Sequence, residues 1–136
     1  MMVELKALAP EADFVRLIVG AYLNFYVHTS VAAAGGDPER VVKASRVQIE
    51  RLDDIVFREG GSNIELLDRI RAILGSHVNA LLNPGLSVVW PTPGTVIDED
   101  AHNALGHGGG RVKIAESAIV RDGNGKVLTR ARVQVM

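Results

Sequence analysis

Residues 122–135 read DGNGKVLTRARVQV, and this stretch decides the fold class of the C-terminal part of the chain. From Lys126 onward, β-branched or small residues alternate with longer and mostly polar ones, which is the period-two pattern of a half-buried β-strand. The Asp-Gly and Asn-Gly pairs that precede the strand are turn dipeptides that tolerate positive φ. We therefore predict a hairpin that joins this strand to residues 111–121, with either dipeptide at its tip.

Upstream of Gly85 the chain has the pattern of helices. Residues 38–60 carry apolar side chains at spacings of three and four residues, and Asp37-Pro38 supplies an N-cap and a first helical position. A second amphipathic helix begins at a capping box from Ser62 to Glu65 and ends at Asn-Pro-Gly, residues 83–85. We predict that the two helices form an antiparallel hairpin around the short Gly-rich turn.

A third predicted helix, residues 14–34, is apolar on all sides. Such a helix is buried within a core or against a second copy of the chain, and we expect oligomerisation. Its most apolar run, residues 17–27, is shorter than the roughly 20 residues that a membrane span needs, so we expect no membrane contact.

The order of these elements predicts an α+β fold. We expect a helical region over residues 1–84, followed by a small antiparallel β domain over residues 85–136. The first residues do not have the pattern of a signal peptide, so we expect a cytoplasmic protein.

Charge and composition exclude several classes of function. Fifteen basic residues against 16 acidic ones make a generic nucleic-acid binder a poor interpretation. The absence of cysteine excludes disulfides and thiolate zinc sites. Residues 75–110 carry three acidic and no basic residues, whereas residues 111–136 carry six basic and two acidic ones. This segregation suits a charged protein partner, although a solvated strand face explains it as well.

Four side chains within ten residues could in principle bind a divalent metal or act as acid and base: Asp98, Asp100, His102 and His107. Two His residues five apart do not share a helical face, so we favour loop carboxylates beside a structural His. The Gly-rich run of residues 106–110 lacks the Gly-Lys-Ser/Thr ending of a phosphate-binding loop. We expect neither a cofactor nor an enzymatic activity.

Residues 94–105 read GTVIDEDAHNAL and resemble the signature of the GrpE nucleotide-exchange factors. In that signature a Gly is followed, after three residues, by an Asp; three further residues lead to a His, then one residue, an Ala and an aliphatic residue. Residues 124–135 are similar to the closing strand of that family, and residues 52–55 to its Leu-Asp-Asn-Leu helix. The likeness covers residues 50–136. The chain differs in the apolar residues 14–34, where the family has a long charged helix, and in Thr129, where it has Arg.

The resemblance implies a homodimeric cochaperone that binds the nucleotide-binding domain of a DnaK-type chaperone through a β wing and promotes ADP release. It implies partner-binding roles for six residues: Gly85, Gly94, Asp98, His102, Arg130 and Arg132. The glycines shape a loop, the Asp–His pair fixes the entry into the sheet, and the arginines face the partner. The alternatives are a non-catalytic structural subunit of a homo-oligomeric assembly and, less favoured, a small metal-dependent enzyme.

Overall fold

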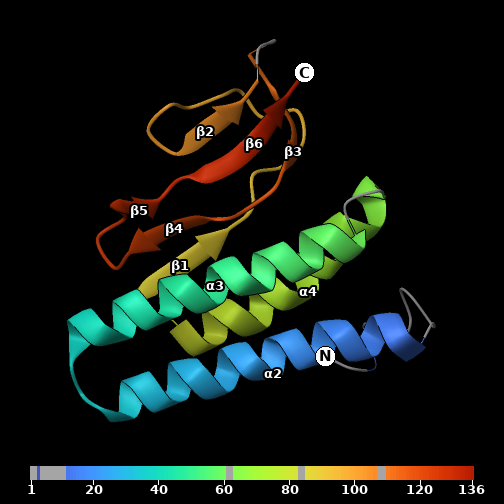
Figure 1. The fold of residues 1–136 in the computed structure, drawn as a ribbon. Helices are drawn as coiled ribbons and strands as arrows, with labels where there is room; N and C mark the ends of the chain where they lie inside the picture. Colours follow the sequence, from blue (N-terminus) through green and yellow to red (C-terminus); the bar gives the residue numbers. More distant parts are fainter. Residues whose placement is uncertain (1–2, 4–11, 61–62, 83–84, 107–109) are drawn as a thin grey trace. The chain divides into compact units, whose positions relative to one another are not determined.

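The described part of the chain forms three long helices followed by six short strands (Figure 1), which confirms the α+β class. The computed structural model describes residue 3 and residues 12–60, 63–82, 85–106 and 110–136. The helices are α2 (Ala12–Ala34), α3 (Pro38–Gly60) and α4 (Ile64–Leu82). The strands are β1 (Leu86–Val89), β2 (His102–Leu105), β3 (Val112–Ala115), β4 (Ile119–Asp122), β5 (Val127–Thr129) and β6 (Ala131–Val135). The chain divides into two compact units, Met1–His77 and Val78–Met136, so the division falls inside α4.

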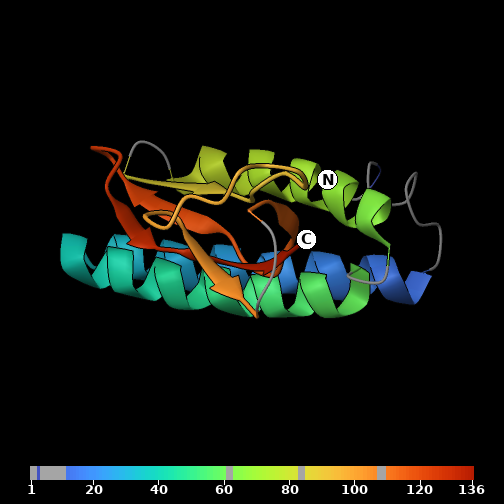
Figure 2. The same cartoon turned by 90° about the horizontal axis from the view of Figure 1, so that it is seen from above.

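Helices α2 and α3 pack closely along their lengths, as two views at right angles show (Figures 1 and 2). Each contributes one buried stripe at spacings of three and four residues, which places the buried side chains on a single helical face. The stripe of α2 consists of Ile18, Ala21, Phe25 and Thr29, and that of α3 of Ser45, Ile49, Leu52 and Val56. The two helices meet at Gly36, whose φ of 75° belongs to the left-handed region that glycine adopts without strain.

Only one face of α2 is buried, although its sequence is apolar all round. Leu23, Val27 and Val31 on its outer side are 53%, 54% and 69% exposed. The expectation that the helix is buried on all sides is therefore not met within one copy of the chain. Among the described residues, those from Arg16 to Ala34 form the one helix that is long and apolar enough, by length and composition, to cross a membrane.

The predicted hairpin of α3 and α4 is wrong, because α3 pairs with α2. The buried stripe of α3 packs along α2. Helix α4 contacts α3 through a longer side chain, Arg71. Arg71 of α4 is only 5% exposed, and its guanidinium carbon lies 6.0 Å from the centre of the Phe57 ring. Burial lowers the pKa of Arg71, while the nearby Asp53 and Asp68 carboxylates act in the opposite direction.

Both helix starts whose capping bonds are described use a short polar side chain. Asp37 Oδ1 accepts a hydrogen bond from the Glu39 N–H at 3.1 Å, as the Asp-Pro pair predicts. At the start of α4, Asn63 Oδ1 accepts from the Leu66 N–H at 3.2 Å. Ser62, the residue predicted to cap α4, lies outside the described residues, so the capping box itself is not described.

The second unit contains two three-stranded sheets, ordered β1-β4-β5 and β2-β6-β3. Their shared core joins Ala101, Val112, Ala115, Ile119, Ala131 and Val133. The predicted antiparallel β domain is corrected at one pair: β2 runs parallel to β6, with His102 opposite Ala131. Strands β3, β4 and β5 lie between them in the chain, and a connection of that length allows a parallel pair.

The predicted hairpin is confirmed between β4 and β5. Asp122 organises its tip: the Asp122 N–H donates to the Lys126 carbonyl, and Asp122 Oδ1 accepts from the Asn124 and Lys126 N–H groups. Gly125 supplies the positive φ of 85°. The single strand predicted after the tip is divided at Arg130, so that β5 and β6 belong to different sheets.

Candidate functional site

The residues that the GrpE resemblance singles out all lie in the second unit, and Gly94 begins the segment that connects most of them. Gly94 has a φ of 92°, a conformation that a side chain disfavours. Its N–H donates to the Val112 carbonyl at 2.7 Å, and its own carbonyl accepts from Arg111 Nη1 at 2.8 Å. Gly94 therefore fixes the loop against the beginning of β3.

Asp98 and His102 are bonded to each other across a single turn. The Asp98 N–H donates to His102 Nδ1 at 3.0 Å, and the His102 N–H donates to the Asp98 carbonyl at 2.7 Å. Asp98 Oδ1 also accepts from the Asp100 N–H at 3.0 Å. Because Nδ1 is an acceptor here, the neutral imidazole carries its proton on Nε2. His102 is 6% exposed, and the pair acts on the backbone rather than on a solvent-facing group.

This turn is joined to the start of β6. The Ala131 N–H donates to the Ala101 carbonyl at 2.9 Å, and Arg130 Nη1 lies 3.3 Å from the Glu99 carbonyl. Backbone and side-chain hydrogen bonds thus bring Asp98 and His102 together with Arg130, which lies more than 25 residues further along the chain. The guanidinium of Arg130 remains exposed.

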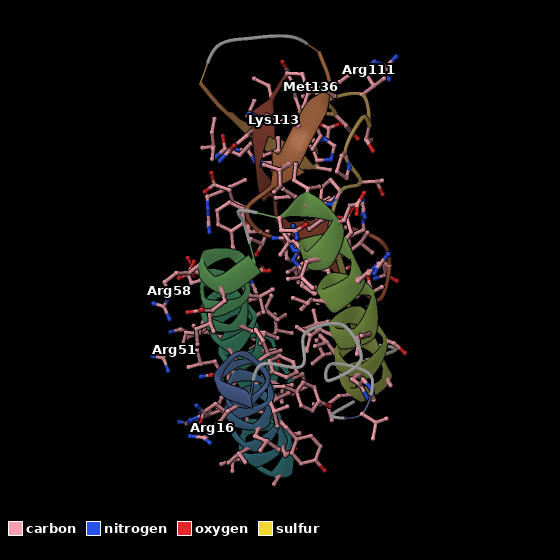
Figure 3. The ribbon with its side chains drawn as sticks, turned by 90° about the vertical axis from the view of Figure 1, so that its right-hand side faces the viewer. Arg16, Arg51, Arg58, Arg111, Lys113 and Met136 are labelled. Atoms are coloured by element: carbon pink, nitrogen blue, oxygen red, sulfur yellow. The ribbon has the colours of Figure 1, made fainter. Side chains whose placement is uncertain are left out.

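The outer face of sheet β2-β6-β3 is polar and carries positive charge. On β6, Ala131 and Val133 are fully buried, so Arg132 between them points to the other face of the sheet. Its neighbour across the parallel pair is Asn103, which is exposed. Lys113 of β3 is exposed between the buried Val112 and Ile114 (Figure 3). The face also holds Gln134, whose Nε2 donates to Glu116 Oε2 at 2.8 Å.

Gly85 is not connected to this group by any described hydrogen bond. It is exposed and precedes β1, whereas the other five residues belong to the loop before β2 or to β6 and the break before it. Its φ is not positive. The structure therefore brings together Gly94, Asp98, His102, Arg130 and Arg132, and leaves Gly85 apart.

The considered metal site is not assembled in the described part of the chain, where no group of three or more His, Asp or Glu residues could hold an ion. His102 is turned toward the Asp98 N–H, and Asp98 toward the Asp100 N–H. His107, the fourth residue of that set, lies outside the described residues.

Two side chains that bind backbone groups of the second unit were not singled out from the sequence, and one of them, Ser117, supports this site. Ser117 Oγ accepts from the Arg132 N–H at 2.9 Å, in a sheet where backbone carbonyls normally take that role. Asn79 of α4 binds both backbone groups of Val88: its Nδ2 donates to the carbonyl and its Oδ1 accepts from the N–H, each at 2.8 Å. A lone Asn among apolar helix residues was the available signal, whereas Ser117 gave none.

No family model, curated protein or solved structure matches this chain.

Proposed function

We propose that the chain is a GrpE-type nucleotide-exchange factor that binds a DnaK-type chaperone through its second unit and promotes ADP release. The observation that carries the proposal is the bonding of the turn at residues 98–102 to the start of β6. Two motifs that resemble one family, and that lie far apart in the chain, meet at this place.

The surface beside this junction supports binding to a protein of opposite charge. Arg130 is exposed at the break before β6, and Arg132 and Lys113 lie on the outer face of the same sheet. Exposed cations on a rigid sheet guide association with an acidic surface and fix its orientation. Gly94 and the Asp98–His102 pair position this surface and need not contact the partner.

Exchange of this kind requires no covalent chemistry. The protein binds the open, nucleotide-free form of the chaperone more tightly than the closed form, and the difference in binding free energy shifts the equilibrium toward release. A surface that contributes the same binding free energy to the open and the closed form of the chaperone has no effect on the equilibrium between them. The contribution of Arg130 must therefore be measured on the rate of release as well as on binding.

Release of fluorescently labelled ADP from a DnaK-type chaperone, followed by stopped flow, tests the proposal. We expect the full chain to accelerate release, and Arg130→Ala to raise the half-saturating concentration at least about fivefold, since an interface side chain that matters contributes more than about 1 kcal/mol. Lys126→Ala is the matched control, because it removes one exposed positive charge from the hairpin tip of the same unit.

An unchanged release rate at saturating protein contradicts the proposal. If the chain then forms a defined high-order assembly in a solution mass measurement, the alternative of a structural subunit is favoured instead. Equal losses from Arg130→Ala and Lys126→Ala leave exchange in place but contradict the assignment of the surface.

A further inference from the structure

The outer side of α2 presents an apolar ridge that none of the described residues of its unit covers. Leu23, Val27 and Val31 are spaced by four residues, so their side chains form one row along the helix, and each is more than half exposed. Residues 17–36 contain no Asp, Glu, Lys or Arg. By contrast, the exposed positions of α3 and α4 include many charged residues, so the ridge is confined to α2.

Arginines border this ridge. Arg16 lies on α2 directly before the uncharged stretch. Arg51 and Arg58 are seven residues apart on α3, and so both lie on one side of that helix. Figure 3 shows these three side chains projecting to the same side of the helical unit. The Arg58 side chain is 68% exposed, with Nε 3.6 Å from Glu59 Oε1. The three guanidinium groups reach solvent, and the acidic residues nearest to them on α3 are Asp54 and Glu59.

Between the ridge and the α3 arginines the surface is hollowed. The hollow has a volume of about 150 Å³ and lies in the groove between α2 and α3. Its polar lining is Asn24 and His28 from α2 and Gln48 and Arg51 from α3, and its apolar lining is Ala21, Leu52 and Ile55. A guanidinium with amide groups beside it suits phosphate oxygens, and the apolar lining suits the first carbons of an acyl chain.

We propose that this surface docks on a bilayer containing anionic phospholipid. The α2–α3 face is defined as Arg16, Leu23, Val27, Val31, Arg51 and Arg58. An apolar helical surface bordered by cations lies in the interface of such a bilayer, with the apolar side chains among the acyl chains and the cations at the headgroups. The short apolar run of residues 17–27 gave no reason to expect membrane contact. Two of the three cations come from α3, and only the folded unit places them beside the ridge.

Two other occupants fit the charges less well. A second copy docked through the same face by a twofold axis would bring two sets of the same three arginines to one interface, and the acidic residues nearest to them on α3, Asp54 and Glu59, already lie beside Arg51 and Arg58 of their own copy. A membrane-spanning α2 would have to leave α3, and so expose to water the buried residues Ile49, Leu52 and Val56 of α3. The docking rests on the helical unit alone and is independent of the proposed exchange function.

Co-sedimentation of the full chain with vesicles tests the docking. We expect binding to phosphatidylcholine vesicles that contain phosphatidylglycerol, much weaker binding to phosphatidylcholine alone, and loss of binding at high salt. Arg51→Ala should lower the partition coefficient about fivefold, because one basic side chain near an anionic surface contributes about 1 kcal/mol. Val27→Asp should abolish binding.

The controls change the same chemistry elsewhere in the helical unit. Arg69→Ala removes an exposed arginine of α4, and Ile64→Asp replaces an exposed apolar residue at the start of α4; neither should change the partition coefficient. Circular dichroism checks that each variant is folded, which the exposure of the substituted side chains leads us to expect.

Three outcomes overturn the docking: no binding of the wild-type chain to the anionic vesicles, equal binding to both vesicle types, or equal losses from the variants and their controls. Concentration-dependent dimerisation that Val27→Asp abolishes, without vesicle binding, overturns it in favour of a second copy. ADP release by Val27→Asp in the absence of vesicles is measured in parallel, so failure of the docking and failure of the exchange function are distinguishable.

Discussion

At the scale of single residues, His102 is the side chain on which the candidate site most depends. Its Nδ1 takes the Asp98 N–H, and its burial leaves no water to replace that bond. Residues of this kind are costly to replace by apolar ones, because an unsatisfied buried donor remains.

His102→Leu should therefore lower the free energy of unfolding of the second unit by about 1–3 kcal/mol. His102→Asn should recover part of the loss, because its Oδ1 occupies a position close to that of Nδ1 and can accept the same bond. Urea denaturation followed by Trp90 fluorescence measures both. Identical losses from the two variants would show that the hydrogen bond is not the source of the stability.

Tyr22 gives the helical unit a dependence on alkaline pH. Its ring contacts His77 edge-on, with ring centres 5.9 Å apart, and also packs beside Phe25 and Tyr26. Burial, with a further contribution from Tyr26, raises the pKa of Tyr22 above its ordinary value of 10.0. The folded state thus favours the protonated phenol. Its contribution to stability is complete below pH 10.0 and is lost as the pH rises through the raised pKa.

We expect the thermal midpoint of the helical unit to fall as the pH rises above about 10, and to fall less steeply in Tyr22→Phe, which cannot ionise. Circular dichroism at 222 nm, the standard helix wavelength, measures the midpoints. Comparison of the two proteins at neutral pH separates any change in packing. Parallel curves over the whole range would exclude Tyr22 as the titrating group.

At the scale of elements, α2 shows how far the sequence could predict the fold. Its helical conformation follows from the absence of proline between Ala12 and Gly35-Gly36, with Gly20 as the single glycine within it, but an all-round apolar sequence contains no signal for which face α3 covers. The stripes of α3 and α4 were readable from their spacing, whereas the choice of partner was not, because a stripe at helical spacing fits either neighbour. The direction of β2 beside β6 was equally hidden, since alternation does not encode parallel or antiparallel pairing.

The same limit applies to the candidate site. The resemblance implied that Asp98 and His102 fix the entry into the sheet, and in the structure the Asp98 carbonyl accepts a hydrogen bond from the His102 N–H. The break at Arg130 could not be predicted, because the period-two alternation continues through it into the second sheet. Gly85 was grouped with the site by the resemblance, and the fold places it outside the bonded group.

Two neighbouring residues test the assignment of the faces of α2. Phe25→Ala should lower the free energy of unfolding of the helical unit by about 3–5 kcal/mol, because Phe25 is 1% exposed and its removal leaves a cavity. Val27→Ala should change it by less than about 0.5 kcal/mol, because Val27 is on the exposed side. Urea denaturation followed by circular dichroism measures both. Comparable losses would mean that Val27 is also buried in solution.

At the scale of the whole molecule, the aromatic residues provide separate probes for the two units. The single tryptophan, Trp90, belongs to Val78–Met136, and both tyrosines, Tyr22 and Tyr26, belong to Met1–His77. Because each unit has its own buried core, each is expected to unfold as its own cooperative unit.

Phe25→Ala should therefore shift the unfolding transition seen in the near-ultraviolet tyrosine signal and leave the midpoint of the Trp90 fluorescence transition unchanged. His102→Leu should do the reverse. Coincident shifts of both probes in either variant would show that the chain unfolds as a single cooperative body, and that α4 transmits stability from one unit to the other.

The two hydrogen bonds between Asn79 and Val88 have a consequence for behaviour at high concentration. Strand β1 is an edge strand of its sheet. Unpaired backbone N–H and carbonyl groups on an edge strand can pair with a strand of another molecule, and repeated pairing produces a fibril. A side-chain carboxamide has the same donor and acceptor as a peptide group, so Asn79 occupies the Val88 backbone groups on that edge. Removing this one side chain uncovers a template for polymerisation.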